Sequence, residues 1–266
     1  MEYYLIKKIF LYKVYLKRIN MNKFEIKSHD GPGRLGRLNK IKTPLLINTE
    51  DFKIADNQGL AYNIEKELAE WSVNETIKKS SEVIKNSDIG VIQGSKYIDL
   101  RIKCCKELEK LGYNMFLIAN GDDLLQHPKD LVELIVKLRE NLNPNSFLIF
   151  PFSECSFIPL LSYMGIDGFL IDSAKYYSYM NVLMTPTKNY DLETYRIYEN
   201  LTREEIEKYN MNTLDLVLRE VKWHMKNRSL RNLVEERANT SPQNIAALKI
   251  LDKEYEDYLL KNTQLF

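Results

Sequence analysis

The stretch that decides the fold is NMFLIANGDDLLQHPKDLVELIVKLRENLNPNSFLIFPF, residues 114–152. Its two ends, 114–120 and 146–152, are continuous apolar runs of the length that buried β-strands have. Between them, residues 127–143 repeat apolar residues with helical spacing, and Pro128 stands where the first turn of a helix tolerates proline. A strand, a helix and a second strand in this order predict a parallel βαβ unit, because parallel neighbours need a crossover connection.

The same alternation continues on both sides of this unit. A capping-box pattern at Ser72–Glu75 predicts the start of a helix, residues 89–94 (IGVIQG) predict a short strand, and 97–112 predict a helix that ends at Gly112. Residues 168–171 (GFLI) predict a further strand. No glycine-rich nucleotide-binding motif follows any of these strands. The predicted fold class is therefore α/β, a TIM-type (β/α) barrel in complete or reduced form.

The regions that flank this pattern differ from it. Residues 21–60 alternate in period two around turns, which predicts a hairpin leading into the first strand. Residues 202–262 are helical throughout. We therefore expect a basic N-terminal extension at 1–20, a barrel at 21–200, and a helical C-terminal segment at 201–266 that packs on the barrel.

Composition narrows the class of protein. The 266 residues are 44% hydrophobic and 28% charged, with a formal net charge of +1, as in a globular protein. No apolar run approaches the about 18 residues that a membrane span needs, and no signal-peptide cleavage site follows the N-terminus. Cys104, Cys105 and Cys155 lack the spacing of a zinc site. We expect a reduced, cytoplasmic protein with no membrane partner, no bound metal and no cofactor.

Positive charge gathers near the N-terminus. Residues 1–42 hold eleven Lys and Arg residues against three Asp and Glu residues. Such a segment can contact the phosphates of a nucleic acid. It can equally be a solvated basic segment without a partner, and the sequence leaves both readings open.

Polar residues follow three of the predicted strands, at the ends where the chemistry of parallel barrels lies. The candidate site residues are Gln93, Asn120, Asp122, Asp123, Asp172 and Ser173. A structural reading exists for most of them. Short polar residues suit a strand-to-helix turn at 120–123, and Asp172 can serve as the N-cap of the next helix.

Several stretches resemble the tRNA-guanine transglycosylase superfamily, and within it the archaeosine synthase alpha subunits. These stretches are FEIKSHDGPGRLGRL (24–38), VIQGSKYIDLR (91–101), PLLSYMGIDGF (159–169) and LRNLVEERANTSPQNIAALKILDKEYEDYL (230–259). The resemblance covers roughly residues 22–262 in order and spacing. It implies a (β/α)8 barrel in which a strand-end aspartate attacks the ribose and displaces guanine from tRNA. In the synthases it implies instead that lysine is joined to the nitrile of 7-cyano-7-deazaguanine in tRNA, after which a radical-SAM partner cleaves the adduct.

The family pattern Gly-x-Asp-x-Phe-Asp is disturbed in this chain. Gly165, Asp167 and Phe169 fit it, but Leu170 and one more residue precede Asp172. The nucleophile position is therefore either Asp172 or Leu170. We favour Asp172, because the Ser-Ala pair that follows the family aspartate also follows it here.

Other family features are missing from this sequence. The cysteine and histidine cluster that binds zinc, the Asp-Ser-Gly-x-x-Gln recognition loop and the C-terminal RNA-binding half have no counterpart here. We therefore expect a core subunit for archaeosine formation that acts on tRNA with a separate subunit carrying the missing half, with Asp172 as general base. The alternative is a non-catalytic partner of a paralogous transglycosylase or synthase. An unrelated small-molecule enzyme on the same barrel is a third reading, because a fold does not fix a function.

Overall fold

The computed structural model describes residues 23–152, 154–196 and 201–262. At its centre is a five-stranded parallel sheet, whose strands in spatial order are β4 (Leu45–Ile47), β8 (Gly168–Leu170), β7 (Phe147–Phe150), β6 (Met115–Ile118) and β5 (Ile89–Ile92). All neighbouring strands run parallel, which confirms the predicted α/β class. The basic extension expected at residues 1–20 lies outside the described residues.

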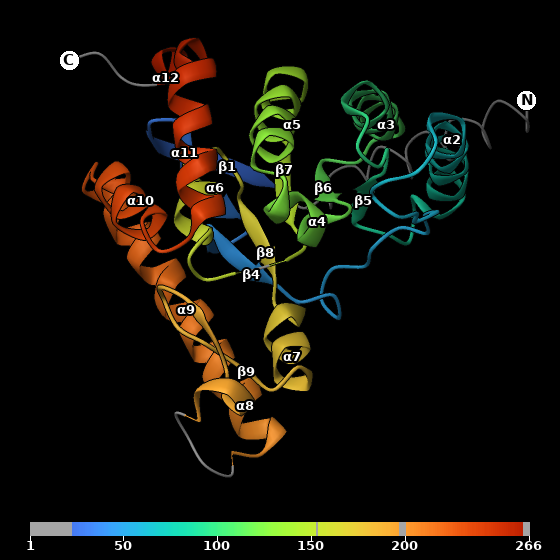
Figure 1. Ribbon diagram of the computed structural model, residues 1–266. Helices are drawn as coiled ribbons and strands as arrows, with labels where there is room; N and C mark the ends of the chain where they lie inside the picture. Colours follow the sequence, from blue (N-terminus) through green and yellow to red (C-terminus); the bar gives the residue numbers. More distant parts are fainter. Residues whose placement is uncertain (1–22, 153, 197–200, 263–266) are drawn as a thin grey trace, which may run out of the picture.

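The two faces of the sheet belong to two different hydrophobic clusters. On the inner face, alternate strand residues form an apolar cluster that Phe24 and Leu38 close over. The outer face packs against helices. Figure 1 shows α2 (Lys66–Val83), α3 (Ile98–Leu111) and α5 (Pro128–Asn141) standing in a row along the sheet. The described residues thus form a reduced barrel wall, with helices on one face and its own side chains filling the other.

A small antiparallel sheet precedes the parallel one. It contains β1 (Phe24–Asp30), β2 (Gly33–Leu38) and β3 (Ile41–Thr43), as the period-two pattern predicts. Gly36 lies where this sheet is tightest. A Cβ atom there would lie 2.3 Å from the backbone oxygen of Glu25, so only glycine fits. This sheet delivers the chain directly into β4.

Asp167, which the sequence places beside the last strand, locks the amino-terminal end of the sheet. It is fully buried. Its carboxylate accepts hydrogen bonds from Arg34 Nε of β2 at 2.9 Å, from Arg139 Nη2 of α5 at 2.6 Å and from the backbone of Leu148 at 2.9 Å. Two guanidinium groups from distant elements therefore converge on one carboxylate, and this cluster ties the hairpin, α5, β7 and β8 together.

Helices follow the last sheet strand, interrupted by one hairpin. In order they are α7 (Asp172–Tyr179), the hairpin of β9 (Val182–Met184) and β10 (Asn189–Asp191), α8 (Leu192–Tyr195), α9 (Arg203–Lys226), α10 (Leu230–Ala238), α11 (Pro242–Glu254) and α12 (Glu256–Asn262). Helix α9 packs on α7, α10 on α6 (Ile158–Tyr163), and α11 on α5. Figure 1 shows α9 running from the hairpin region towards α10. None of the described helices is both long enough and apolar enough to span a bilayer.

The start predicted at Ser72–Glu75 is wrong. Helix α2 already begins at Lys66, with Glu65 as an N-cap that makes no side-chain cap bond. Ser72 lies inside the helix, and its hydroxyl donates to the backbone oxygen of Gln58 at 2.5 Å. Good helix formers before Ser72 extend the helix, because propensity summed over a turn outweighs one unused cap.

Candidate functional site

Gln93 and Asn120, two of the expected site residues, both bind one loop at the carboxyl ends of β5 and β6. Gln93 Nε2 donates to Asn57 Oδ1 at 3.0 Å, and Asn120 Nδ2 donates to the backbone oxygen of Leu60 at 3.0 Å. Gln93 is only 4% exposed. The structure therefore brings the two amides to one edge, where their recorded hydrogen bonds hold the segment 55–62 across the strand ends.

A buried arginine organises the same edge. Arg101 is fully buried, and it donates to the backbone oxygens of Ser95 at 2.6 Å, Ala119 at 3.0 Å and Ile92 at 3.3 Å, and to Asn120 Oδ1 at 3.3 Å. Burial lowers the pKa of this guanidinium to about 10, so it stays charged near neutral pH. This one cation therefore donates to three backbone carbonyls near the ends of β5 and β6, of which that of Ile92 also accepts from the backbone N–H of Ala119.

Asp122 and Asp123 lie in the first turn of the short helix α4 (Gly121–Gln126), and Asn120 before them has a left-handed φ of 58°. Asp122 is exposed and Asp123 half-buried. In the described residues no hydrogen bond joins either carboxylate to another expected site residue. Acidic side chains favour the first turn of a helix, which fits the turn reading of this stretch.

Asp172 lies at the start of α7, where it is exposed. The N-cap of α7 is Ile171, without a side-chain cap bond, so the reading of Asp172 as N-cap is wrong. Ser173 is buried, and its hydroxyl donates to the backbone oxygen of Leu170 at 3.1 Å. Leu170 belongs to the inner apolar cluster and pairs with Ile47 of β4. The strand-end position that faces the sheet interior is therefore occupied by Leu170, two residues before Asp172.

Sequence reasoning missed Glu154, a carboxylate in the loop after β7. The hydroxyl of Tyr177 on α7 donates to Glu154 Oε1 at 3.0 Å. Burial raises the pKa of Glu154, and the hydrogen bond from Tyr177 opposes that rise only in part. No cation forms an ion pair with Glu154 in the part of the chain that the structure describes. The one available signal was its place, two residues beyond the end of the predicted strand at 146–152.

Glu154 lines a hollow with a volume of about 280 Å³. The hollow lies between the end of α4, the loop after β7, the β9–β10 turn and the start of α11. Its lining residues are Leu125, Gln126, Glu154, Ser156, Phe157, Thr187, Lys188, Asn189, Thr240, Ser241 and Gln243. Most of them carry amide, hydroxyl or charged groups, so this hollow, on the carboxyl side of β6 and β7, is the polar pocket of the described fold.

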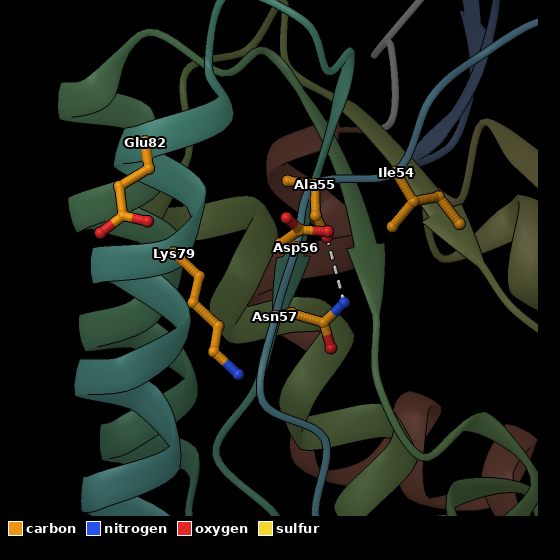
Figure 2. Close-up of a pocket in the computed structure, with 6 residues that line it drawn as sticks. All are labelled: Ile54, Ala55, Asp56, Asn57, Lys79 and Glu82. Atoms are coloured by element: carbon orange, nitrogen blue, oxygen red, sulfur yellow. Dashed lines mark hydrogen bonds between the residues drawn. The ribbon is translucent and has the colours of Figure 1, made fainter.

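Figure 2 shows a second, more open hollow, between α2 and residues 54–57, with a volume of about 600 Å³. Asn57 Nδ2 donates to the backbone oxygen of Ala55 at 3.1 Å, the bond drawn in Figure 2. The ammonium of Lys79 donates to Gln58 Oε1 at 2.7 Å. Asn57 and Lys79 thus form hydrogen bonds to nearby residues of the same loop, and the two groups do not converge on a common point.

The thiols are inert. Cys104, Cys105 and Cys155 are buried and unpaired, and burial raises the pKa of Cys104 and of Cys105 to about 12. A thiol with such a pKa is not a nucleophile near neutral pH. In the described ranges, no three His, Cys, Asp or Glu side chains lie close enough together to hold a metal ion.

Tyrosines and cations gather on the surface around α7 and the β9–β10 hairpin. Tyr176 and Tyr179 are each about half exposed, at 50% and 56%. The guanidinium of Arg203 lies 4.1 Å from the ring centre of Tyr179, and the ammonium of Lys188 lies over two further tyrosine rings. We call this set, Tyr176, Tyr179, Tyr190, Tyr195, Lys188 and Arg203, the tyrosine surface. Aromatic faces beside cations are the groups on which unpaired bases stack.

Several known proteins are similar to this chain. The family model of queuine tRNA-ribosyltransferase (TGT) matches residues 12–209. An archaeosine synthase of Methanocaldococcus jannaschii is 29% identical over 167 residues, 63% of this chain and 26% of the relative. A tRNA-guanine(15) transglycosylase of the same organism is 26% identical over 234 residues, 75% of this chain and 35% of the relative.

A third relative extends over more of the chain. The archaeosine synthase subunit alpha of Thermococcus kodakarensis is 24% identical over 266 residues, 91% of this chain and 43% of the relative. The chain thus spans less than half the length of each of these three proteins. Because the family model takes in well over half of the residues, including the parallel sheet and its carboxyl edge, this chain belongs to the queuine tRNA-ribosyltransferase (TGT) family.

Proposed function

We propose that this chain takes part in archaeosine-type tRNA modification as a core subunit that acts after base exchange. In this proposal it works on tRNA that already carries 7-cyano-7-deazaguanine and joins lysine to the nitrile. Family membership and the names of the relatives support a role in tRNA modification. In this proposal a separate subunit supplies an RNA-binding half, and a radical-SAM enzyme acts on the lysine adduct.

The observation that carries this proposal is the inward side chain of Leu170. Base exchange by the family's route needs a carboxylate at the strand end, facing the bound nucleoside. Here the end of β8 presents an apolar side chain that is 8% exposed within the inner cluster. A strand end of this kind offers no nucleophile, which favours a reaction other than base exchange.

Asp172 is the proposed general base. A nitrile carbon accepts an amine when the amine has lost its proton and the nitrile nitrogen can gain one. The exposed carboxylate at the start of α7 would take the proton from the lysine amine and return it to the nitrile nitrogen, as the C–N bond forms. Gln93, Asn120, Asp122, Asp123 and Ser173 would help to shape the site around the base. The tyrosine surface beside α7 would contact the tRNA.

The non-catalytic reading has its own support. The recorded side-chain hydrogen bonds of Gln93 and Asn120 go to the segment 55–62 and to Arg101, and Asp172 has no hydrogen-bonding group recorded against it in the described residues. A chain built this way would serve as a partner that shapes the tRNA site of an active paralogue.

A reconstituted transfer assay separates the two. The full chain and its candidate second subunit are mixed with labelled lysine and tRNA carrying 7-cyano-7-deazaguanine. For catalysis we expect Asp172→Asn to lower the rate by about 100-fold or more, with tRNA binding unchanged. Asp257→Asn, an exposed change on α12, is the control and should keep the full rate. If Asp172→Asn also keeps it, the chain is the non-catalytic partner.

A further inference from the structure

Glu154 is a half-buried acid that has no counter-ion among the described residues. Taking a carboxylate out of water, even in part, is costly unless a cation or several donors compensate. Within the described ranges, the one side chain that bonds to its carboxylate is the neutral hydroxyl of Tyr177, at 3.0 Å. The fully buried carboxylate of Asp167 shows what compensation looks like in this chain, since two arginines bind it. No described arginine or lysine binds Glu154 in this way.

Lys188, the cationic side chain in the lining of this pocket, contacts two tyrosine rings. Lys188 lines the hollow, but its ammonium lies 4.6 Å from the ring centre of Tyr190 and 4.9 Å from that of Tyr195. Cation–π contacts of this geometry hold an ammonium in place. Of the cations that the structure describes, none therefore binds the carboxylate of Glu154 where it lines the hollow.

The rest of the lining suits a small polar ligand. Gln126 of α4, Gln243 of α11 and Asn189 at the start of β10 bring amide groups to the same hollow, and Ser241 brings a hydroxyl. The volume of about 280 Å³ lies just below the range of roughly 300–1,000 Å³ that small-molecule pockets occupy. A single amino acid or a short alkylamine fits that scale, and a folded protein segment does not.

We propose that this pocket binds a small molecule that carries a primary ammonium group, with Glu154 as its counter-ion. The ammonium donates to the carboxylate oxygen that Tyr177 leaves free, and the amides hold the remainder of the ligand. Free lysine as the physiological ligand rests on the proposed function. The preference for an ammonium rests on Glu154 and its surroundings alone.

Calorimetric titration of the full chain, without tRNA, tests the proposal. The probes are L-lysine, n-pentylamine, and 1-pentanol as the neutral isostere of the amine. We expect lysine and pentylamine to bind and pentanol not to bind. Glu154→Gln keeps an oxygen that can accept from Tyr177, so the fold should survive, and near-ultraviolet circular dichroism checks this. The variant should bind lysine at least about tenfold more weakly, as expected when a charged hydrogen-bond partner is lost.

The matched control is Glu82→Gln, the same change in the open hollow of Figure 2, which should bind lysine like the wild type. Equal affinity of Glu154→Gln and the wild type would overturn the proposal, as would binding of pentanol. A lysine-containing peptide is tested alongside. Tighter binding of the peptide than of free lysine would assign the pocket to a partner protein and overturn the small-molecule assignment.

The outcome is separable from that of the proposed function. Lysine binding with no transfer to tRNA would defeat the proposed reaction and leave the pocket standing. Transfer that persists in Glu154→Gln at an unchanged KM for lysine would defeat the pocket and leave the reaction standing.

Discussion

The carboxylates of Asp167 and Glu154 lie towards opposite ends of the same parallel sheet, and their surroundings differ. Asp167 is fully buried, and Glu154 is half-buried. Asp167, at the amino-terminal end, accepts hydrogen bonds from two arginines and a backbone amide. Glu154, beyond the carboxyl end, accepts one side-chain hydrogen bond, from a tyrosine. One carboxylate has its charge fully compensated within the protein, and the other does not.

We interpret this difference in charge compensation as a difference in role. The amino-terminal end of the sheet, with Asp167, stabilises the fold, and the carboxyl end, with Glu154, is the end at which we propose that a ligand binds. A compensated charge adds stability only as long as every partner remains, because removing one leaves the others buried and unpaired. An uncompensated charge lowers stability in the free protein and gains when a cation arrives. In barrels of this type the amino-terminal face is used for stability and the carboxyl face for chemistry. The structural role of Asp167 and the proposed ligand-binding role of Glu154 would follow that division.

The largest effect is expected for Asp167→Asn. The change keeps the shape of the side chain but leaves Arg34 and Arg139 close together without an anion. We expect a loss of about 3–5 kcal/mol in the free energy of unfolding, measured by urea denaturation. The control is Asp252→Asn, which removes a half-exposed partner of Arg231 and should cost about 1 kcal/mol or less. Equal losses for the two variants would show that the cluster of Asp167, Arg34 and Arg139 does not stabilise the fold more than an exposed ion pair does.

Arg101→Met tests whether the carboxyl edge also has a structural anchor. The methionine fills the space but removes the donor that Arg101 gives to the backbone oxygens of Ser95 and Ala119, next to the ends of β5 and β6. We expect a loss of about 2–3 kcal/mol, with faster amide hydrogen exchange in the segment 55–62. Arg219→Met, on the exposed side of α9, should change stability by less than about 0.5 kcal/mol. Unchanged exchange in 55–62 would contradict the anchoring role.

Tyr177→Phe removes the hydroxyl that Glu154 accepts and keeps the ring, which packs edge-on against Phe152. We expect a loss of about 1–2 kcal/mol near neutral pH. The loss should shrink when Glu154→Gln is also present, because a neutral amide needs the donor less than a buried carboxylate does. Tyr176→Phe, next in the chain and half exposed, serves as the control with almost no effect. An equal loss in both backgrounds would show that Glu154 and Tyr177 are not coupled.

Asp172→Asn should have the smallest effect on stability. Its side chain is exposed, and no structural partner is recorded for it in the described residues. We expect a change within about 0.5 kcal/mol, by the same urea denaturation. A loss as large as that of Tyr177→Phe would mean that Asp172 is part of the packing of α7, and its proposed catalytic role would need another explanation.

The sheet could be predicted from the sequence because its signal is local. Continuous apolar runs such as 147–150, with helical sequence between them, allow few other folds. The hairpin before β4 followed from period-two alternation in the same way. The missed start of α2 shows the limit of local signals. A capping box at Ser72 is a strong pattern, yet the residues before it are helix formers as well, and the longer helix forms.

The site could be predicted only in part, because local sequence patterns do not determine which side chains are buried or which distant residues contact each other. Gln93 and Asn120 were found by their places after strands, but their bonds to the segment 55–62 join residues far apart in the chain. Glu154 went unnoticed because one acid after an apolar run looks like any surface residue. Its partner Tyr177 is 23 residues away, on a helix whose packing no pattern specifies.

The most direct test of the contrast between the two ends is the pH dependence of unfolding for the wild type and Glu154→Gln. Burial raises the pKa of Glu154 in the folded state above its ordinary value of 4.5. Below that value the group is protonated in both folded and unfolded chains. As the pH rises towards the folded pKa, the unfolded chain releases the proton first, so the wild type loses stability that the variant keeps. Burial and the neighbouring Glu154 raise the pKa of Tyr177, so its hydroxyl stays neutral over this range.

Urea denaturation of both proteins between about pH 4 and pH 8 measures the difference. We predict that Glu154→Gln is nearly as stable as the wild type at the acid end, and becomes the more stable of the two as the pH rises, until the difference levels off. A difference that stays constant with pH, or a variant less stable than the wild type near neutral pH, would contradict an uncompensated carboxylate at the carboxyl end of the sheet.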